Sequence, residues 1–153
     1  MNQKASSPFG DDSLDWSYPS SPETLLKKAR AAQKAAYVPY SGFPVGAALL
    51  TTEGKILQSC NVENASYGLS LCAERNVLTR AVSEGNRDFV AIAVVGRSGE
   101  PCLPCGACRQ FMAEFNPALI VVLEEGEKPL LYRLDLDLLP RPFILAKEMP
   151  FEG

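Results

Sequence analysis

The chain has 153 residues, of which 46% are hydrophobic and 22% are charged, a composition typical of one globular domain with a sizeable core. Its net charge is −3 and it contains no histidine, which excludes Ser-His-Asp and Cys-His catalysis as well as metal sites with imidazole ligands. It has no strongly basic stretch and no apolar run of roughly 20 residues, so we expect neither nucleic acid nor a membrane as a partner. We expect a small, nearly neutral molecule as the ligand.

The first residues, MNQKASSPFGDDSLDWSYPSSPE, lack the basic region and apolar stretch of a secretory signal, so we expect a cytoplasmic protein with reduced thiols. Residues 1–20 are polar and rich in Ser, Pro and Asp, which predicts a disordered N-terminal tail ahead of a single domain over residues 21–153. Two aromatic residues of this tail, Trp16 and Tyr18, could dock on the body of the domain.

The first predicted element is a helix, because Ser21 can cap its first turn and Pro22 suits the first helical position. Pro39 is expected to end it. Residues 43–64 predict two strands around a turn at Gly54. The elements that follow are a helix over residues 73–85, a buried strand over 88–96, a helix over 106–115, a buried strand over 118–125, a weaker strand over 129–136 and a helical turn over 136–140. Strands that alternate with helices predict an α/β fold, a three-layer α/β/α sandwich with a mixed sheet of about five strands.

The cysteines offer the main chemical signal. Cys105 and Cys108 form a C-x-x-C pair at the start of a predicted helix, where free amides and the helix dipole favour thiolates. Such a pair alone is compatible with a redox dithiol, half of a zinc knuckle or two core cysteines. Cys72 begins another predicted helix, so three thiolates from two helix starts could hold zinc with one position open, as catalytic sites do. A closed structural zinc site, with Cys102 or Cys60 as the fourth ligand, is the alternative.

Glu74 favours the catalytic alternative. It follows Cys72 by two residues at the same predicted helix start. A carboxylate beside an open zinc site can accept and return the proton of a bound water. A surface glutamate that merely favours the helix dipole is the ordinary alternative, but the position of Glu74 within a ligand motif favours a catalytic role.

A family resemblance follows from these motifs. The segments CAE and PCGAC match the zinc-deaminase signature, in which His or Cys stands two residues before Glu and P-C-x-x-C follows. Together with AYVPYSGFPVGAALL, CNVENASYG, CAERNVLTRAVSEG and PCGACRQ, they make the chain closely similar to cytidine deaminases of the small homotetrameric, three-cysteine type, over roughly residues 23–145. The missing histidine is explained, because this subclass has CAE where other base deaminases have HAE.

The resemblance implies the composition of the metal site. One zinc ion per chain is bound by Cys72, Cys105 and Cys108, and Glu74 is the catalytic residue. Arg75 hydrogen-bonds the ligand thiolates and, with the two helix N-termini, offsets their negative charge.

The resemblance also implies how a nucleoside is bound. Asn61 and Glu63 alternate along a strand end, so both can point to one face, and they grip the ribose 3′-hydroxyl. Phe43 lines the base pocket, Tyr67 lies at its rim, and backbone groups around Ala73 and Cys105 orient the amino group.

Phe143 occupies the position of an aromatic residue that stacks on the base from a neighbouring subunit. The surrounding sequence departs from the family pattern there, since Arg141 and Pro142 precede it and ILAKEMPFEG replaces the usual acidic stretch.

The implied function is hydrolytic deamination of cytidine and 2′-deoxycytidine to uridine and 2′-deoxyuridine with release of ammonia, a reaction of pyrimidine salvage. The implied assembly is a homotetramer with active sites at subunit interfaces. Two alternatives remain. One is a deaminase of another cytosine-like nucleoside such as blasticidin S. The other is a non-catalytic interaction module stabilised by zinc, which would have no use for the carboxylate of Glu74. Editing of polynucleotides is disfavoured by the acidic charge balance and by the lack of a basic, aromatic groove.

Overall fold

A five-stranded sheet forms the middle layer of the structure, a computed structural model that describes residues 14–145. The strand order is β2-β1-β3-β4-β5, in which β3 and β4 are parallel and the other neighbouring pairs are antiparallel. The sheet is therefore mixed, as predicted. The strands are β1 (Gly46–Thr51), β2 (Ile56–Cys60), β3 (Phe89–Val95), β4 (Ile120–Glu125) and β5 (Lys128–Arg133).

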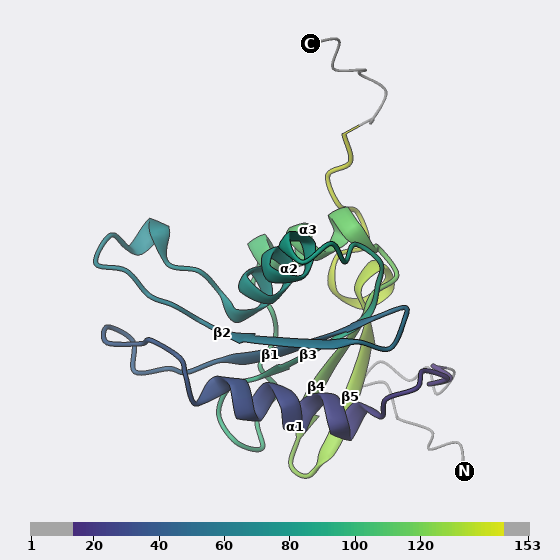
Figure 1. The fold of residues 1–153 in the computed structure, drawn as a ribbon, viewed down its shortest axis with the longest axis horizontal. Coiled ribbons are helices and arrows are strands. Elements are labelled where there is room, and N and C mark those ends of the chain that lie inside the picture. Colours follow the sequence, from purple (N-terminus) through teal and green to yellow (C-terminus); the bar gives the residue numbers. More distant parts are fainter. Residues whose placement is uncertain (1–13, 146–153) are drawn as a thin grey trace.

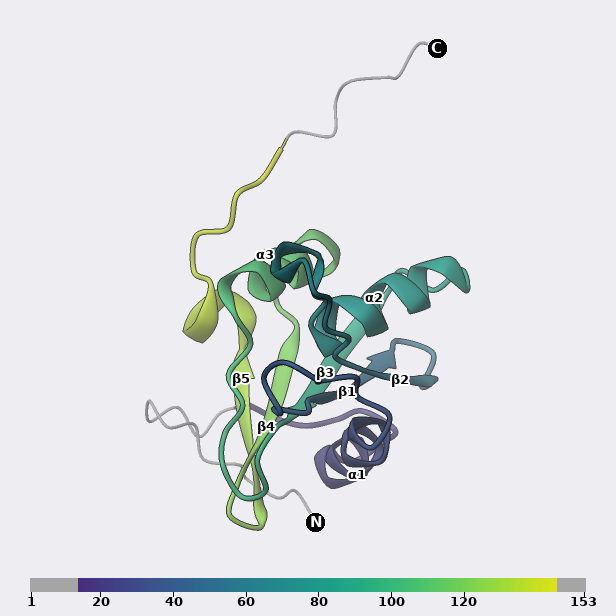
Figure 2. The ribbon, with the colours of Figure 1, turned by 90° about the vertical axis from the view of Figure 1, so that its left-hand side faces the viewer.

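Helices cover both faces of this sheet. Helix α1 (Pro22–Gln33) lies on one face, and α2 (Ala73–Ser83) and α3 (Gly106–Phe115) lie together on the other (Figure 1). The view turned by 90° shows the same three layers, with α2 beside α3 (Figure 2). The prediction of a three-layer α/β/α sandwich is confirmed. Two apolar clusters fill the spaces between the layers, one on each face of the sheet.

The register of the sheet brings the starts of α2 and α3 together. Gly46 at the beginning of β1 pairs with Cys60 on one side and with Val95 on the other. These two residues end β2 and β3, so both strands finish at the same level of the sheet. The chain continues from each of these ends towards a helix on the same face, α2 after β2 and α3 after β3.

Helix α1 begins as predicted but ends earlier than Pro39. The Ser21 hydroxyl accepts a hydrogen bond from the backbone N–H of Thr24, and Pro22 occupies the first turn. The helix ends at Gln33 because the chain then pairs with a distant segment: Tyr37 donates its N–H to Asn61 O and accepts at its carbonyl from the N–H of Glu63. Backbone groups that would have continued the helix are therefore used in a tertiary contact.

A close approach between α1 and β1 requires the glycine at position 46. A Cβ atom there would lie 2.0 Å from Ala29 O and 2.8 Å from Gln33 N, so no larger residue fits without displacing the helix. This close approach places the polar side chains in the last turn of α1 beside the loop before β1 and the loop after β3.

The segment before α1 packs on the sheet. Leu14, Trp16 and Tyr18 contact the apolar cluster on the α1 side, and Trp16 Nε1 donates to Ser20 O at 2.8 Å. Trp16 and Tyr18, for which docking was only one possibility, are thus packed on the domain, whereas residues 1–13 of the predicted tail lie outside the described residues.

Two loops extend past the end of α1, at the left of Figure 1: residues 34–45 and residues 61–72, the second of which contains a short 3₁₀ turn (Tyr67–Leu69). A helical turn (Leu134–Leu138) follows β5 and leads into an extended C-terminal segment. Within residues 14–145, no helix has the length and apolar character needed to cross a membrane.

Candidate active site

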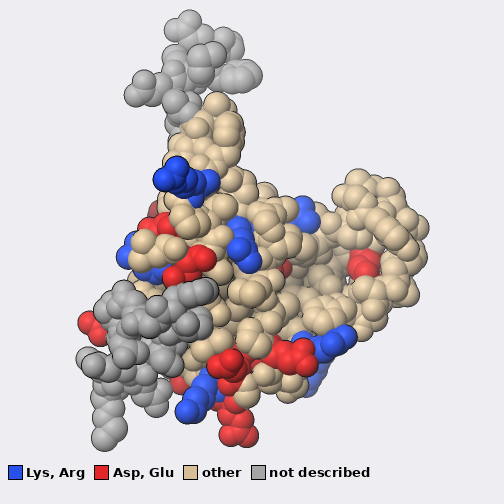
Figure 3. All heavy atoms as spheres, turned by 180° about the vertical axis from the view of Figure 1, so that it is seen from behind, with Lys and Arg blue, Asp and Glu red and all other residues tan. Residues whose placement is uncertain are grey.

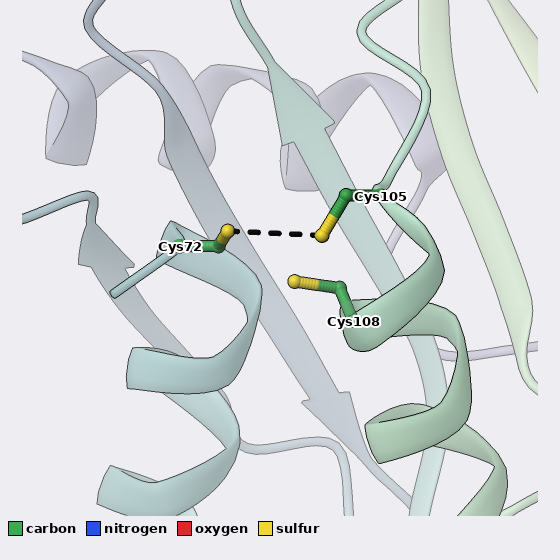
Figure 4. Close-up of side chains that lie close together, drawn as sticks. All are labelled: Cys72, Cys105 and Cys108. Atoms are coloured by element: carbon green, nitrogen blue, oxygen red, sulfur yellow. Dashed lines mark hydrogen bonds between the residues drawn. The ribbon is translucent and has the colours of Figure 1, made fainter. Parts of the chain in front are cut away.

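Three thiol groups converge where α2 and α3 begin. Cys72 is the N-cap residue of α2, Cys105 is the N-cap residue of α3, and Cys108 lies one turn further along α3. Figure 4 shows their sulfur atoms pointing towards one another from the two helices. The three Sγ atoms lie within 4.8 Å of one another, and those of Cys72 and Cys105 are 3.9 Å apart.

This spacing fits a tetrahedral zinc ion. Zinc binds thiolates at about 2.3 Å, which places two ligand sulfur atoms of a tetrahedron about 3.8 Å apart. Among the described residues, the cluster contains these three thiols and neither Cys60 nor Cys102. The closed four-cysteine alternative is thus not formed, and the donor set is that of a site for one zinc ion per chain, with a fourth coordination position for water or substrate.

The surroundings favour a thiolate at Cys72. The hydrogen bond from the Cys108 thiol, with further help from Arg75, lowers the pKa of Cys72 to about 5. The same contact raises the pKa of Cys108, because one proton is shared between two sulfur atoms. Arg75 Nη2 lies 3.7 Å from Cys72 Sγ, which agrees with the predicted contact to a ligand thiolate. Burial raises the pKa of Cys102 to about 11, so that side chain stays a neutral thiol.

Glu74 lies in the first turn of α2 and is only 4% exposed. Burial raises its pKa to about 7, and the negative charge of Cys72 adds to the effect. A carboxyl group with a pKa near neutrality can both accept and donate protons at physiological pH.

A half-open cavity of about 150 Å³ connects this carboxyl group with the thiols. Its lining residues are Val45, Asn61, Cys72, Ala73, Glu74, Cys102, Leu103 and Cys105. The structure therefore brings Glu74, Ala73, Asn61 and two ligand cysteines into one cavity, with Cys108 directly behind them. The sequence analysis did not identify Val45 and Leu103, whose apolar side chains carry no chemical signature.

Asn61 and Glu63 brace the loop opposite the thiols. Asn61 Oδ1 accepts from the N–H of Val45 at 2.9 Å, and its Nδ2 donates to Phe43 O at 3.0 Å. The carboxylate of Glu63 accepts from the N–H groups of Tyr40 and Ser41 at 3.2–3.3 Å. Both side chains keep capacity for a ligand, since an amide and a carboxylate each form more hydrogen bonds than these.

The three aromatic residues of the predicted pocket do not line this cavity. The ring of Phe43 lies against Gly96, and the guanidinium of Arg97 sits over it, 5.4 Å from the ring centroid. The side chains of Tyr67 and Phe143 are 74% and 73% exposed on the surface of the chain. Their predicted contacts with a base or its rim stay predictions.

Two polar side chains near the end of α1 hold the loops next to the cavity. Gln33 Nε2 donates to Pro44 O at 2.8 Å and to Gly96 O at 2.6 Å, which ties together the loops before β1 and after β3. Arg30 also donates to Gly96 O and forms an ion pair with Glu124. The sequence analysis did not identify these residues, because they look like ordinary polar positions of an amphipathic helix.

Arg109 is another residue to which the sequence analysis gave no role. Its Nε donates to Pro104 O at 2.8 Å and its Nη1 to Leu138 O at 3.0 Å. It thereby fixes the loop that precedes Cys105. Its position directly after Cys108 was the sequence signal that could have indicated a role near the thiol cluster.

Comparisons with known proteins agree on one family. Residues 19–124 match the sequence profile of the family described as cytidine and deoxycytidylate deaminase zinc-binding region. The cytidine deaminase of Halalkalibacterium halodurans is 58% identical over 96 residues, 63% of this chain and 73% of that protein. The crystal structure of cytidine deaminase from Burkholderia pseudomallei superposes with a TM-score of 0.76 and 49% identity, covering 81% of this chain and 100% of that one. The blasticidin-S deaminase of Bacillus cereus is also similar, with 33% identity over 92 residues, 55% of this chain and 66% of that protein.

Alanine substitution of single cysteines tests the ligand set. Replacing Cys72, Cys105 or Cys108 should abolish stoichiometric zinc binding, because each supplies one of three mutually close sulfur atoms. Replacing Cys60 or Cys102 should leave one zinc ion per chain, which makes these two variants matched controls. The measurement is metal analysis of the purified proteins. Full zinc content in any of the first three variants, or loss of zinc from the Cys102 variant, would refute the assignment.

Proposed function

The chain belongs to the cytidine and deoxycytidylate deaminase family, and on this basis we propose that it hydrolyses cytidine and 2′-deoxycytidine to uridine and 2′-deoxyuridine, with release of ammonia. The observation that carries the proposal is the buried carboxyl group of Glu74 in the same cavity as the thiol cluster. A structural zinc site has no use for such a group, whereas hydrolysis requires a residue that moves protons.

In the proposed reaction, Glu74 is the proton carrier. Zinc, when bound by Cys72, Cys105 and Cys108, supplies the Lewis acidity that makes water an effective nucleophile at neutral pH. Glu74 accepts a proton from the attacking water and delivers it to ring nitrogen N3, which makes carbon C4 electrophilic. It then carries the second proton of the water to the amino group, so that the C4–N bond breaks and ammonia leaves while the C4 carbonyl forms.

Neighbouring groups hold the reactants in place for this proton transfer. Backbone groups at Ala73 and Cys105, both of which line the cavity, orient the amino group that leaves. Arg75 donates to a ligand sulfur and partly neutralises the three thiolates. Reduced charge on the thiolates keeps the metal Lewis acidic.

Asn61 and Glu63 recognise the ribose in this proposal. Asn61 lines the cavity, and Glu63 lies two residues further along and braces the same loop. A carboxylate that accepts from a sugar hydroxyl gives a strong, charge-assisted hydrogen bond. Phe43 and Tyr67 contribute to the base pocket and to its rim, and both belong to the two loops that extend beyond α1.

A second candidate substrate is blasticidin S, which the similarity to the Bacillus cereus enzyme favours. The identity to cytidine deaminases is higher, at 58% for the Halalkalibacterium halodurans enzyme, so cytidine is the first choice. Parallel turnover assays with cytidine, free cytosine and blasticidin S separate the candidates.

The proposed assembly is a homotetramer in the cytoplasm with active sites between subunits. Apolar side chains are exposed on the two adjacent loops, and the single chain carries them without cover: Tyr37, Tyr40, Val62, Tyr67, Leu69 and Leu71. Figure 3 shows the projecting lobe at its right as almost free of charged side chains. A monomer rarely exposes such a patch. The cavity is also smaller than a typical ligand pocket. Side chains of neighbouring subunits would enlarge it in the proposed assembly. All five cysteines are free, as a reducing compartment requires.

Substitution of Glu74 by glutamine tests the mechanism. The amide cannot accept the proton of the water, so turnover of cytidine should fall by about 10²- to 10⁴-fold or more. Zinc content and thermal stability should stay close to those of the wild type. The matched control is Glu84→Gln at the exposed end of the same helix, which should retain full turnover. Near-normal turnover by the Glu74 variant would exclude this residue as the proton carrier.

The substrate 3′-deoxycytidine tests the ribose contact. A hydrogen bond to a charged group contributes about 1.5–3 kcal/mol, so kcat/KM should fall about tenfold or more without the 3′-hydroxyl. Glu63→Gln should narrow this ratio, because the charged acceptor is lost while one oxygen remains to brace the loop. The measurement is four specificity constants, from two enzymes and two substrates. An unchanged ratio would mean that Glu63 does not recognise the hydroxyl.

Hybrid oligomers test the shared active site. Glu74→Gln and Phe143→Ala impair different parts of a site, and in the proposed tetramer these parts come from different subunits. Co-expression of the two variants should therefore give some sites with both residues intact, and activity above the sum of the separate variants. Sedimentation velocity of the wild type should show a particle of four chains. An active monomer, or hybrids without recovered activity, would contradict the proposal.

A further inference from the structure

Gln110 of α3 holds the backbone of a residue near the C-terminal end of the described chain. Its Nε2 donates to Phe143 O at 2.9 Å, and its Oε1 accepts from the N–H of Phe143 at 2.9 Å. The side-chain amide thus satisfies both backbone groups of Phe143, as a neighbouring strand would. Gln110 lies two residues after the ligand Cys108, on the same helix.

Arg109 anchors the start of the same segment, residues 138–145, which we term the C-terminal arm. Its guanidinium donates to Leu138 O at 3.0 Å while it also donates to Pro104 O in the loop before Cys105. Two successive residues of α3 therefore hold the arm at two points. Figures 1 and 2 both show the yellow end of the described chain leaving the body of the molecule after the helical turn that follows β5.

The arm is held by its backbone, and the apolar side chains of its last three residues are left uncovered. Phe143, Ile144 and Leu145 are 73%, 76% and 74% exposed. Immobilising a glutamine side chain costs conformational entropy, and a clamp that served only the stability of its own chain would be expected to bury the residue that it holds. Here it fixes the position of Phe143 and leaves the ring accessible from outside.

We propose that Gln110, together with Arg109, is a positioning residue that presents Phe143 to the cavity of a neighbouring copy of this chain. The inference rests on the proposed function, in which Phe143 stacks on the base bound by another subunit. Because Cys105, Cys108 and Gln110 share one helix, the element that holds metal in one subunit also aims the aromatic ring at the next. The rim of the receiving cavity offers an apolar contact, since Leu103 is exposed there.

A double-mutant comparison tests the inference with the full-length enzyme. The proteins are wild type, Gln110→Ala, Phe143→Ala and the double variant, each assayed for kcat and KM with cytidine. Loss of a base-stacking side chain should raise KM about tenfold or more in Phe143→Ala. Gln110→Ala should raise KM about fivefold with kcat within about twofold of wild type, because the ring is present but no longer held. In the Phe143→Ala background the same substitution should add less than about twofold, because no ring remains to be positioned.

Two further variants sharpen the comparison. Gln110→Glu keeps an acceptor for the N–H of Phe143 but sets a carboxylate oxygen against its carbonyl, so its KM should lie between those of wild type and Gln110→Ala. Gln58→Ala is the matched control on strand β2, since the side-chain amide of Gln58 forms no hydrogen bond within residues 14–145, and its constants should equal those of wild type. Zinc content and sedimentation are measured for every variant and should not change.

An equal fold-change from Gln110→Ala in both backgrounds would overturn the inference, and so would an unchanged KM, a loss of zinc or dissociation of the oligomer in that variant. If wild type deaminates cytidine but Phe143→Ala has normal constants, the stacking role and the clamp fall while the deaminase function stands. If wild type does not deaminate cytidine, the proposed function itself falls and the clamp loses its purpose.

Discussion

Three thiolates can share a small volume only where positive charge offsets their mutual repulsion, and the rest of this structure follows from that requirement. The N-termini of α2 and α3 each present free amides and a positive dipole end to the cluster. Arg75 adds a guanidinium group to the same point. The sheet register sets these helix starts side by side, because β2 and β3 end opposite one residue of β1. The metal site is therefore a property of the fold and not of one segment.

The proposed proton carrier, Glu74, depends on the same convergence. Glu74 is buried in the first turn of α2, two residues after the N-cap Cys72, and this burial raises its pKa to about 7. Cys108 belongs both to the thiol cluster and to the apolar cluster between the sheet and these helices, so the site is in direct contact with the core. A change of packing beneath α2 or α3 would move both the ligands and the carboxyl group.

The loops around the cavity are held by side chains that bond to backbone, in place of regular structure. Asn61, Gln33 and Arg109 each join two segments in this way. Loops positioned by a rigid scaffold are where binding groups usually lie. In this chain the metal ligands and Glu74 sit on helix starts, while the predicted sugar and base contacts sit on these braced loops and on the C-terminal arm. In the proposed assembly, the reacting groups therefore belong to one subunit, whereas substrate recognition also involves a neighbouring subunit.

The sequence by itself determined the features that depend on short spacing. The N-cap of α1, the C-x-x-C pair at the start of α3 and the place of Glu74 in the first turn of α2 are local features, and all were predicted correctly. Only the tertiary structure decided where α1 ends, because Tyr37, beyond the helix, forms its backbone hydrogen bonds with Asn61 and Glu63. It alone also revealed the roles of Gln33, Arg109 and Gln110, whose partners lie 63, 29 and 33 residues away. Polar side chains at helical positions carry no periodic signal for such distant partners, since their hydrogen bonds form only once the sheet has set the elements in place.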